Sequence, residues 1–440
     1  MSVRRVESPI QARAYIPCKV SVDEKKHLLH KAGIVGNFIR MKLFFPFKEG
    51  KVKEGLSSAQ DFWEMPGADP EYHRKEAIHR HFNRYNQSIV IKVDGKEIRL
   101  KCLVIESKGC SKEGALNHLI VQGNTSNLDN NMPGLYPFLD SYMKQKEGNE
   151  NLPPGRFIIF NHYDNMICKG ERAKEERYLP GDMDEWGFLF KKTIESFTNE
   201  YGRFQLITAH SLGNIPIVAQ LKHLKKEEFM KFFPDTLFLA KGPSSLYEVS
   251  KNVPFEFGCY PYGWFLLIGM VLYYLAKWTG WTLELDETLV DKLKTLPKTE
   301  DVVQRLYETN LIVSQVKDDH YFPGKAGLAS SKKLDQINDI VNLYRVHFKI
   351  PPTRTTKKGG HNFNPGLIKK AFVEKQNLYH KGKKIVDHKT SKEVSENTED
   401  HHLLLKDGEN IIDAVLRSAW TTSLASRGSL ANRVSDLKVA

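Results

Sequence analysis

Short apolar runs that alternate with longer helical stretches constrain the fold of this chain more than any other feature. Helical periodicity occurs at 134–147, 185–201 and 212–227. The apolar runs are LNHLIVQG (116–123), GRFIIFNH (155–162), FQLITAH (204–210), TLFLAKG (236–242) and NLIVSQV (310–316). Continuous apolar strands that alternate with helices are typical of a mostly parallel sheet with helices on both faces. The sequence therefore predicts an α/β fold.

An antiparallel strand pair is predicted just before this region. Two β-rich runs within 88–107 flank an Asp-Gly pair, which is a strong hairpin signal. We place the α/β domain at 86–385 and interpret residues 1–85 as a mostly helical or irregular N-terminal extension. Residues 386–440 are interpreted as a polar linker, one short amphipathic helix and a tail.

The composition indicates a globular protein with a large core, because the 440 residues are 40% hydrophobic. The five cysteines are scattered and show no Cys-x-x-Cys spacing, which argues against a disulfide framework and against a zinc site. His73, His79 and His81 have no adjacent group of cysteines or aspartates, so we interpret them as surface histidines. We expect no metal and no organic cofactor.

The net charge of +12 is concentrated in residues 354–392, where eleven lysines and arginines accompany only Glu374 and Asp387. Such a stretch can bind nucleic acid or an anionic membrane, but we favour an ordinary solvated, lysine-rich surface. No RNP-type aromatic pattern, zinc-finger spacing or helix-turn-helix signature accompanies it, so we expect no nucleic-acid partner. The first twenty residues carry charges but no apolar h-region, so no cleavable secretory signal is predicted.

The segment 262–281, YGWFLLIGMVLYYLAKWTGW, is nearly uncharged over its first fifteen residues and lies between two predicted strands. A membrane span needs about 20 apolar residues, so we expect a helix in a cap or lid inserted at about 245–300. The residues expected to line its acyl pocket are Trp264, Phe265, Leu266 and Tyr273. Aromatic residues suit a core, a lid and a membrane interface alike, so peripheral membrane contact through this segment stays open.

Residues 206–213, LITAHSLG, join the end of a predicted strand to the start of a predicted helix. A nucleophile elbow needs small residues two positions before and two after its serine, and Ala209 and Gly213 occupy those positions around Ser211. The pattern is short enough to occur by chance, and its alternative meaning is an ordinary serine before a helix. Its place between strand and helix favours a nucleophile.

The expected partners of Ser211 follow it in the order acid and then histidine. Asp318 and Asp319 come directly after the run at 310–316; we favour Asp319 as the residue that orients the histidine, with Asp318 as the alternative. His361 follows two glycines that let its loop turn inward, and we predict that it is the general base.

Two backbone amides are needed to stabilise the oxyanion that forms during acyl transfer. The first is the amide of Leu212, directly after the serine. The second is expected from Asn124 or Thr125, because Gly123 and Asn124 end the run at 116–123. The residue types and their order along the chain match those of a serine hydrolase triad with its oxyanion amides. Together they predict that Ser211 is a working nucleophile.

Seven short motifs occur over roughly residues 85–370 in the order QGNTSN, FNHYDN, ITAHSLGN, KGPSSLYEVSK, WTGWTLELD, KDDHYFP and GGHN. In this ordered set the chain resembles a group of α/β-hydrolase-like proteins, the chlamydial CHLPS proteins and the Legionella SidB/SdbC-type secreted effectors. Two positions differ from that group. Ala209 replaces the first glycine of the elbow, and NHYDNMICKG stands where a glycine-bearing turn is usual, a difference that would alter the acyl pocket.

The resemblance implies an α/β-hydrolase fold with a helical cap and a lipase- or esterase-like activity on an ester or thioester, with a lipid as substrate. It also implies a bacterial effector that is cytoplasmic before its delivery into a host cell. Such effectors lack N-terminal signals and often carry a polar, Glu-containing C-terminal translocation signal, which SKEVSENTEDHH fits. We further expect a monomer. The alternative is a catalytically idle hydrolase fold that binds a membrane or a protein.

Overall fold

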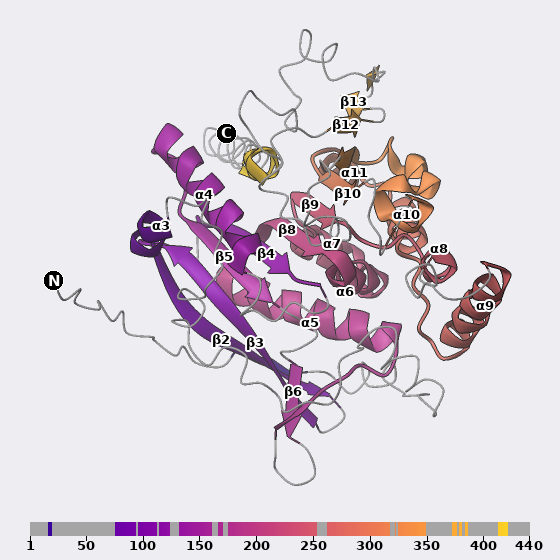
Figure 1. Ribbon diagram of the computed structural model, residues 1–440. Helices are drawn as coiled ribbons and strands as arrows, with labels where there is room; N and C mark the ends of the chain where they lie inside the picture. The colour runs from indigo at the N-terminus through magenta and orange to yellow at the C-terminus, as the bar shows by residue number, and fades with distance from the viewer. Residues whose placement is uncertain are drawn as a thin grey trace, which may run out of the picture.

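The computed structural model describes residues 16–19, 75–93, 96–111, 114–123, 132–160, 166–169, 175–252, 262–316, 322, 324–348, 372–375, 378–380, 383–385 and 412–420. Within these ranges, twelve strands form one sheet at the centre of the molecule, with helices around it (Figure 1).

The strands of this sheet are β1 (Ile16–Lys19), β2 (Phe82–Val93), β3 (Lys96–Ser107), β4 (Leu116–Val121), β5 (Gly155–Phe160), β6 (Met166–Lys169), β7 (Glu175–Arg177), β8 (Phe204–His210), β9 (Thr236–Ala240), β10 (Asn310–Val316), β11 (Asn342–Phe348) and β12 (Phe372–Lys375). A separate hairpin consists of β13 (Leu378–His380) and β14 (Lys383–Ile385). The α-helices are α3 (Lys75–His81), α4 (Met132–Gly148), α5 (Met183–Tyr201), α6 (Asn214–Ala219), α7 (Lys226–Phe232), α8 (Leu246–Asn252), α9 (Tyr262–Trp278), α10 (Leu285–Thr295) and α11 (Glu300–Tyr307).

The strand order identifies the fold. The main path runs β2-β3-β5-β4-β8-β9-β10-β11, with β1 and β12 added at the two edges. Strand β3 is antiparallel to each of its three partners, β2, β5 and β6, whereas every pair along the path from β5 to β11 is parallel. The sheet is therefore mostly parallel, its second strand on the main path runs antiparallel to the rest, and β5 lies between β3 and β4. This is the strand arrangement of the α/β-hydrolase fold. The predicted fold class is confirmed.

The predicted hairpin and apolar strands are present. Strands β2 and β3 pair along their whole lengths, and the five apolar runs correspond to β4, β5, β8, β9 and β10. Strand β11 could not be located from the sequence, because Arg345 interrupts its apolar pattern. That arginine is buried in the structure, where its guanidinium donates to the carbonyl oxygen of Ala329 at 2.9 Å and pairs with Asp335.

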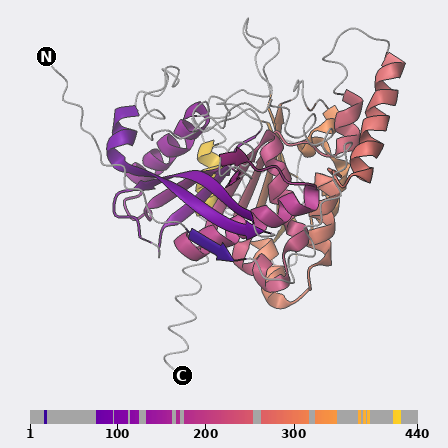
Figure 2. The same ribbon diagram turned by 90° about the horizontal axis from the view of Figure 1, so that it is seen from below.

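Strand side chains alternate between two hydrophobic cores, one on each face of the sheet. In β5, Ile158 and Phe160 belong to the core shared with α5 and α6, whereas Phe157 and Ile159 belong to the core shared with α4. All four side chains are fully buried, which explains why the strand has a continuous apolar sequence. Figure 2 shows helices on either side of the twisted strands.

A helix at 412–420 completes the core on the α4 side. Its buried side chains include Ile412, Leu416 and Trp420. The hydroxyl of Ser418 accepts a hydrogen bond from Asn310 of β10 at 2.9 Å. The sequence-based boundary at residue 385 therefore separates this helix from the core to which it belongs.

Four helices, α8 to α11, lie between β9 and β10, where the sequence predicts an insertion. Figures 1 and 2 both show α9 at the periphery of the molecule. Among the described residues, no helix combines the length and the apolarity that a membrane crossing requires.

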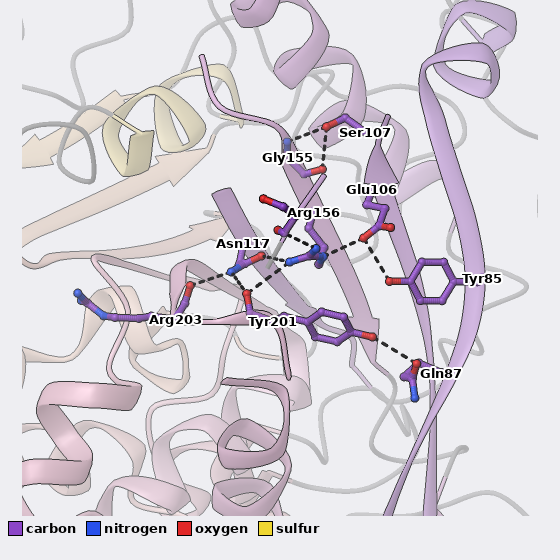
Figure 3. Close-up of polar contacts among 10 residues, drawn as sticks. Tyr85, Gln87, Glu106, Ser107, Asn117, Gly155, Arg156, Tyr201 and Arg203 are labelled. Carbon is purple, nitrogen blue, oxygen red and sulfur yellow. Dashed lines mark hydrogen bonds and ion pairs between the residues drawn. The ribbon is translucent and has the colours of Figure 1, made fainter. Parts of the chain in front are cut away.

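A buried polar network holds the amino-terminal ends of the parallel strands together (Figure 3). Arg156, at the start of β5, pairs with Glu106 at the end of β3, with 2.9 Å between Nε and Oε2. It also donates to the side-chain oxygen of Asn117 at 3.0 Å and to the carbonyl oxygen of Ser111 at 3.1 Å. Its guanidinium lies 4.8 Å from the centre of the Tyr201 ring. This network is at the sheet edge opposite to the end of β8.

Candidate active site

Ser211 lies at the carboxyl end of β8, in the turn between this strand and α6. The turn is a short 3₁₀ helix, Ser211–Gly213. The φ angle of Ser211 is +54°, in the left-handed region that residues other than glycine rarely adopt. Such a conformation costs about 1–3 kcal/mol and occurs mainly where a function requires it. A strained serine between a central strand and a helix is the geometry of a nucleophile elbow.

The end of β4 contacts the elbow so closely that only glycine fits at two positions. A Cβ atom on Gly213 would lie 2.6 Å from the carbonyl oxygen of Gln122. A Cβ atom on Gly123 would lie 2.8 Å from the Cβ atom of Ser211 and 3.4 Å from its hydroxyl oxygen. Ala209, two residues before the serine, is fully buried. The small residues around Ser211 therefore bring the backbone that follows β4 beside the hydroxyl.

The contact between Gly123 and Ser211 lies beside the residues expected to form the oxyanion site. Leu212, whose amide is the first expected donor, directly follows Ser211 in the 3₁₀ turn and is half-buried. Asn124 and Thr125, the candidates for the second donor, lie outside the described residues. The last described residue before them, Gly123, already touches Ser211.

Asn214 holds the elbow in place, a role that the sequence analysis missed. Its side chain is fully buried, and its amide nitrogen donates to the carbonyl oxygens of Ser211 at 2.6 Å and Ala240 at 3.2 Å. The two bonds join the elbow to the end of β9. Gly242 makes room for this amide, since a Cβ atom there would lie 2.6 Å from Nδ2 of Asn214. The signal in the sequence is only an asparagine directly after the elbow glycine.

Asp318 and Asp319 lie outside the described residues, but the residues on either side of 317–321 are described. Gln315 of β10 is buried, and its side-chain nitrogen donates to the carbonyl oxygen of Phe322 at 2.6 Å. Its side-chain oxygen accepts from the hydroxyl of Ser330 at 3.1 Å. Val316 and Phe322, the described residues on either side of 317–321, therefore lie at the carboxyl edge of the sheet, the edge that carries Ser211.

His361 also lies outside the described residues. The strand before it, β11, is parallel to β10 and ends at Phe348, again at the carboxyl edge. Of the residues expected to line an acyl pocket, Trp264, Phe265 and Leu266 belong to α9, but only the backbone of this part of the helix is described. Tyr273, about two helical turns further along, lines a polar pocket, and its hydroxyl donates to Glu284 at 3.4 Å.

His118 is the fully buried histidine of β4, on the face of the sheet that packs against α4. Its Nε2 atom lies 2.8 Å from the hydroxyl of Thr208, and its ring contacts Phe138 and Phe157 edge to face. Burial lowers the pKa of His118 to about 3. Among the described residues, no cluster of histidine, cysteine and carboxylate side chains is suited to hold a metal ion.

His118 predicts a loss of stability in mild acid. Its folded-state pKa lies below the ordinary value of 6.5, so below pH 6.5 the unfolded chain binds a proton that the folded chain does not. The free energy of unfolding should then fall by about 1.4 kcal/mol per pH unit, or about 2 kcal/mol between pH 6.5 and 5. Urea unfolding of the native protein and of His118→Gln at pH 7 and pH 5 measures this contribution. The same pH dependence in both proteins would contradict it.

Comparisons with known proteins add structural likenesses only. No family model and no curated protein sequence matches the chain. Similar solved structures include Est1E from Butyrivibrio proteoclasticus, at 12% identity over 60% of this chain and 88% of that chain, with a TM-score of 0.33. Others are a Pyrobaculum calidifontis esterase (9% identity, 72% and 89% of the chains, TM-score 0.34) and carboxyl esterase 2 from the fungus Tuber melanosporum (10%, 65% and 81%, 0.36). The names describe those proteins, and the fold of this chain follows from its own strand order. The resemblance to the CHLPS and SidB/SdbC-type proteins stays a prediction.

Proposed function

We propose that this protein is a serine hydrolase that cleaves carboxylic esters or thioesters, with lipids as its substrate class. One observation carries the proposal: Ser211 is held in a left-handed conformation at the carboxyl end of β8, with Gly123 packed against it and Gly213 packed against the backbone of Gln122. A strained turn of this kind presents a serine hydroxyl for attack while the neighbouring amides face the developing oxyanion.

The proposed mechanism is acyl transfer in two steps. His361 removes the proton from Ser211, whose oxygen attacks the carbonyl carbon, and the amides of Leu212 and Asn124 stabilise the oxyanion. His361 then gives the proton to the leaving alcohol or thiol as the acyl-enzyme forms. Water activated by the same histidine cleaves the acyl-enzyme and restores Ser211. A carboxylate at 318 or 319 orients the imidazole and stabilises its protonated form.

The two aspartates can be told apart by kinetics. We expect Asp319→Asn to lower kcat for a short p-nitrophenyl ester by more than about 10²-fold, because the neutral amide no longer stabilises the imidazolium. Asp318→Asn should change kcat by less than about threefold, and each variant serves as the matched control for the other. The reverse pattern would assign the role to Asp318. Full activity in both variants would contradict a triad acid in this segment.

Peripheral membrane contact through 262–281 is a second proposal, and α9 carries the observation that favours it. Met270, Val271, Tyr274 and Trp278 are 40%, 49%, 62% and 76% exposed. Exposed aromatic residues on one apolar helix suit the interface of a bilayer. Co-sedimentation with vesicles should therefore weaken in Trp278→Ala and Tyr274→Ala. If Ser211 proves idle while vesicle binding persists, the hydrolase fold serves as a binding module instead.

Delivery into a host cell as a monomeric bacterial effector is proposed from the sequence resemblance alone. A reporter fused to the chain should appear in the host cytoplasm during infection, and deletion of residues 386–401 should prevent this. Light scattering of the purified protein should give the mass of one chain, 50.5 kDa.

A further inference from the structure

A polar pocket of about 560 Å³ lies between α8, α9, the start of α10 and the loop after β10. Ser211 is not among the residues that line it. Ser244 and Ser245 of its wall directly follow the end of β9, so the pocket opens at the carboxyl edge of the sheet, as the elbow does. A volume of this size accommodates a small ligand.

Two tyrosines and two carboxylates form one part of the pocket wall. The rings of Tyr247 and Tyr273 meet edge to face, with 5.3 Å between their centres. Glu248 and Glu284 line the pocket beside them, and Tyr273 donates to Glu284. Tyrosine faces combined with carboxylates are the groups that attract a quaternary ammonium ion.

Glu284 is a half-buried carboxylate in this part of the pocket. Burial, together with the nearby Asp286 and Glu287, raises the pKa of Glu284 above its ordinary value, although Lys333 acts in the opposite direction. Burial and the two acidic neighbours therefore disfavour its carboxylate form. A cation bound there would stabilise it.

Lysines, serines, a threonine and two further carboxylates form the rest of the wall. Lys333 pairs with Glu287 at 2.7 Å, and Ser331 donates to Asp286 at 2.6 Å. The side-chain ammonium groups of Lys277, Lys325 and Lys332 make no hydrogen bond or ion pair with the described residues. Three ammonium groups without carboxylate partners, in a pocket rich in hydroxyls, suit a phosphate group.

We infer that this pocket binds a phosphocholine group, a zwitterion of phosphate and quaternary ammonium. The ammonium lies against Tyr247, Tyr273 and Glu284, and the phosphate lies near Lys325 and Lys332. The charges of the wall match such a ligand, because its four lysines, at 277, 325, 332 and 333, balance its four carboxylates, at 248, 284, 286 and 287. Binding needs no hydrolysis, so this inference does not depend on the role of Ser211.

Calorimetric titration of the full-length protein with phosphocholine tests the inference directly. We expect a Kd below about 1 mM for the native protein and for Ser211→Ala. Tyr247→Ala should weaken binding by about 3- to 30-fold, whereas Tyr247→Phe, which keeps the ring, should not. Lys325→Ala with Lys332→Ala should weaken phosphocholine binding but leave choline binding unchanged. Lys294→Ala is the matched control, since this exposed α10 lysine bonds to Gln336 and does not line the pocket.

Vesicles identify the source of the ligand. Binding to phosphatidylcholine vesicles that is lost in Tyr247→Ala assigns the pocket to a lipid headgroup, and binding of free phosphocholine alone assigns it to a soluble compound. Stronger binding to phosphatidylglycerol than to phosphatidylcholine would overturn the inference, because it would show a preference for simple anions. No phosphocholine binding by the folded native protein, or equal binding by Tyr247→Ala, would also overturn it.

Discussion

Replacing Ser211 with alanine should reduce ester hydrolysis by at least about 10⁴-fold. Without the hydroxyl no acyl-enzyme can form, and what remains is the catalysis supplied by the oxyanion amides and substrate binding. The fold should persist, because alanine fits wherever the serine side chain fits. The measurement is kcat/KM for a series of p-nitrophenyl esters of increasing acyl length.

Ser88→Ala is the control for this change, since Ser88 lies on β2, far along the sheet from β8. It should retain full activity. Thermal unfolding of both variants separates lost chemistry from lost structure. A folded Ser211→Ala protein that hydrolyses esters at the native rate would remove Ser211 from the mechanism.

Replacing Arg156 with methionine should destabilise the protein by about 3–5 kcal/mol. The change leaves Glu106 as a buried charge without its partner, and such a loss costs far more than the net contribution of the intact pair. Both side chains are buried, at 3% and 6% exposure, and Tyr85 also donates to Glu106 at 3.2 Å (Figure 3). The free energy of unfolding in urea, compared at constant m-value, measures the effect.

Two controls define the origin of this loss. Adding Glu106→Gln to Arg156→Met removes the uncompensated charge and should recover part of the stability. Glu287→Gln breaks an exposed ion pair with Lys333 and should cost less than about 1 kcal/mol. A cost below about 1 kcal/mol for Arg156→Met would show that the network at this edge of the sheet is dispensable.

The positions of five central strands could be predicted from the sequence, because strands buried on both faces of a sheet are apolar throughout. β4, β5, β8, β9 and β10 all lie where their apolar runs predict them. β11 was missed for the same reason, since Arg345 lies in the middle of it. A buried arginine is compatible with a strand only through its contacts with Ala329 and Asp335, which lie in a separate loop.

Some residues of the site could not be predicted from the sequence, because their roles depend on contacts between distant segments. The position of Ser211 follows from a local strand-to-helix pattern, which the sequence displays directly. Asn214 and Gln315 are ordinary amides in the sequence, and their roles depend on carbonyl oxygens at the ends of other strands and loops. The polar pocket likewise draws its tyrosines, lysines and carboxylates from four separate segments.

Labelling of the full-length protein with a fluorophosphonate probe tests the central claim most directly. The probe reacts only with a serine whose hydroxyl is activated by a neighbouring base. We predict that the native protein is labelled on the peptide that contains Ser211, and that labelling is lost in both Ser211→Ala and His361→Ala. A folded native protein that stays unlabelled, or a label that persists in Ser211→Ala, would contradict the assignment of Ser211 as the nucleophile.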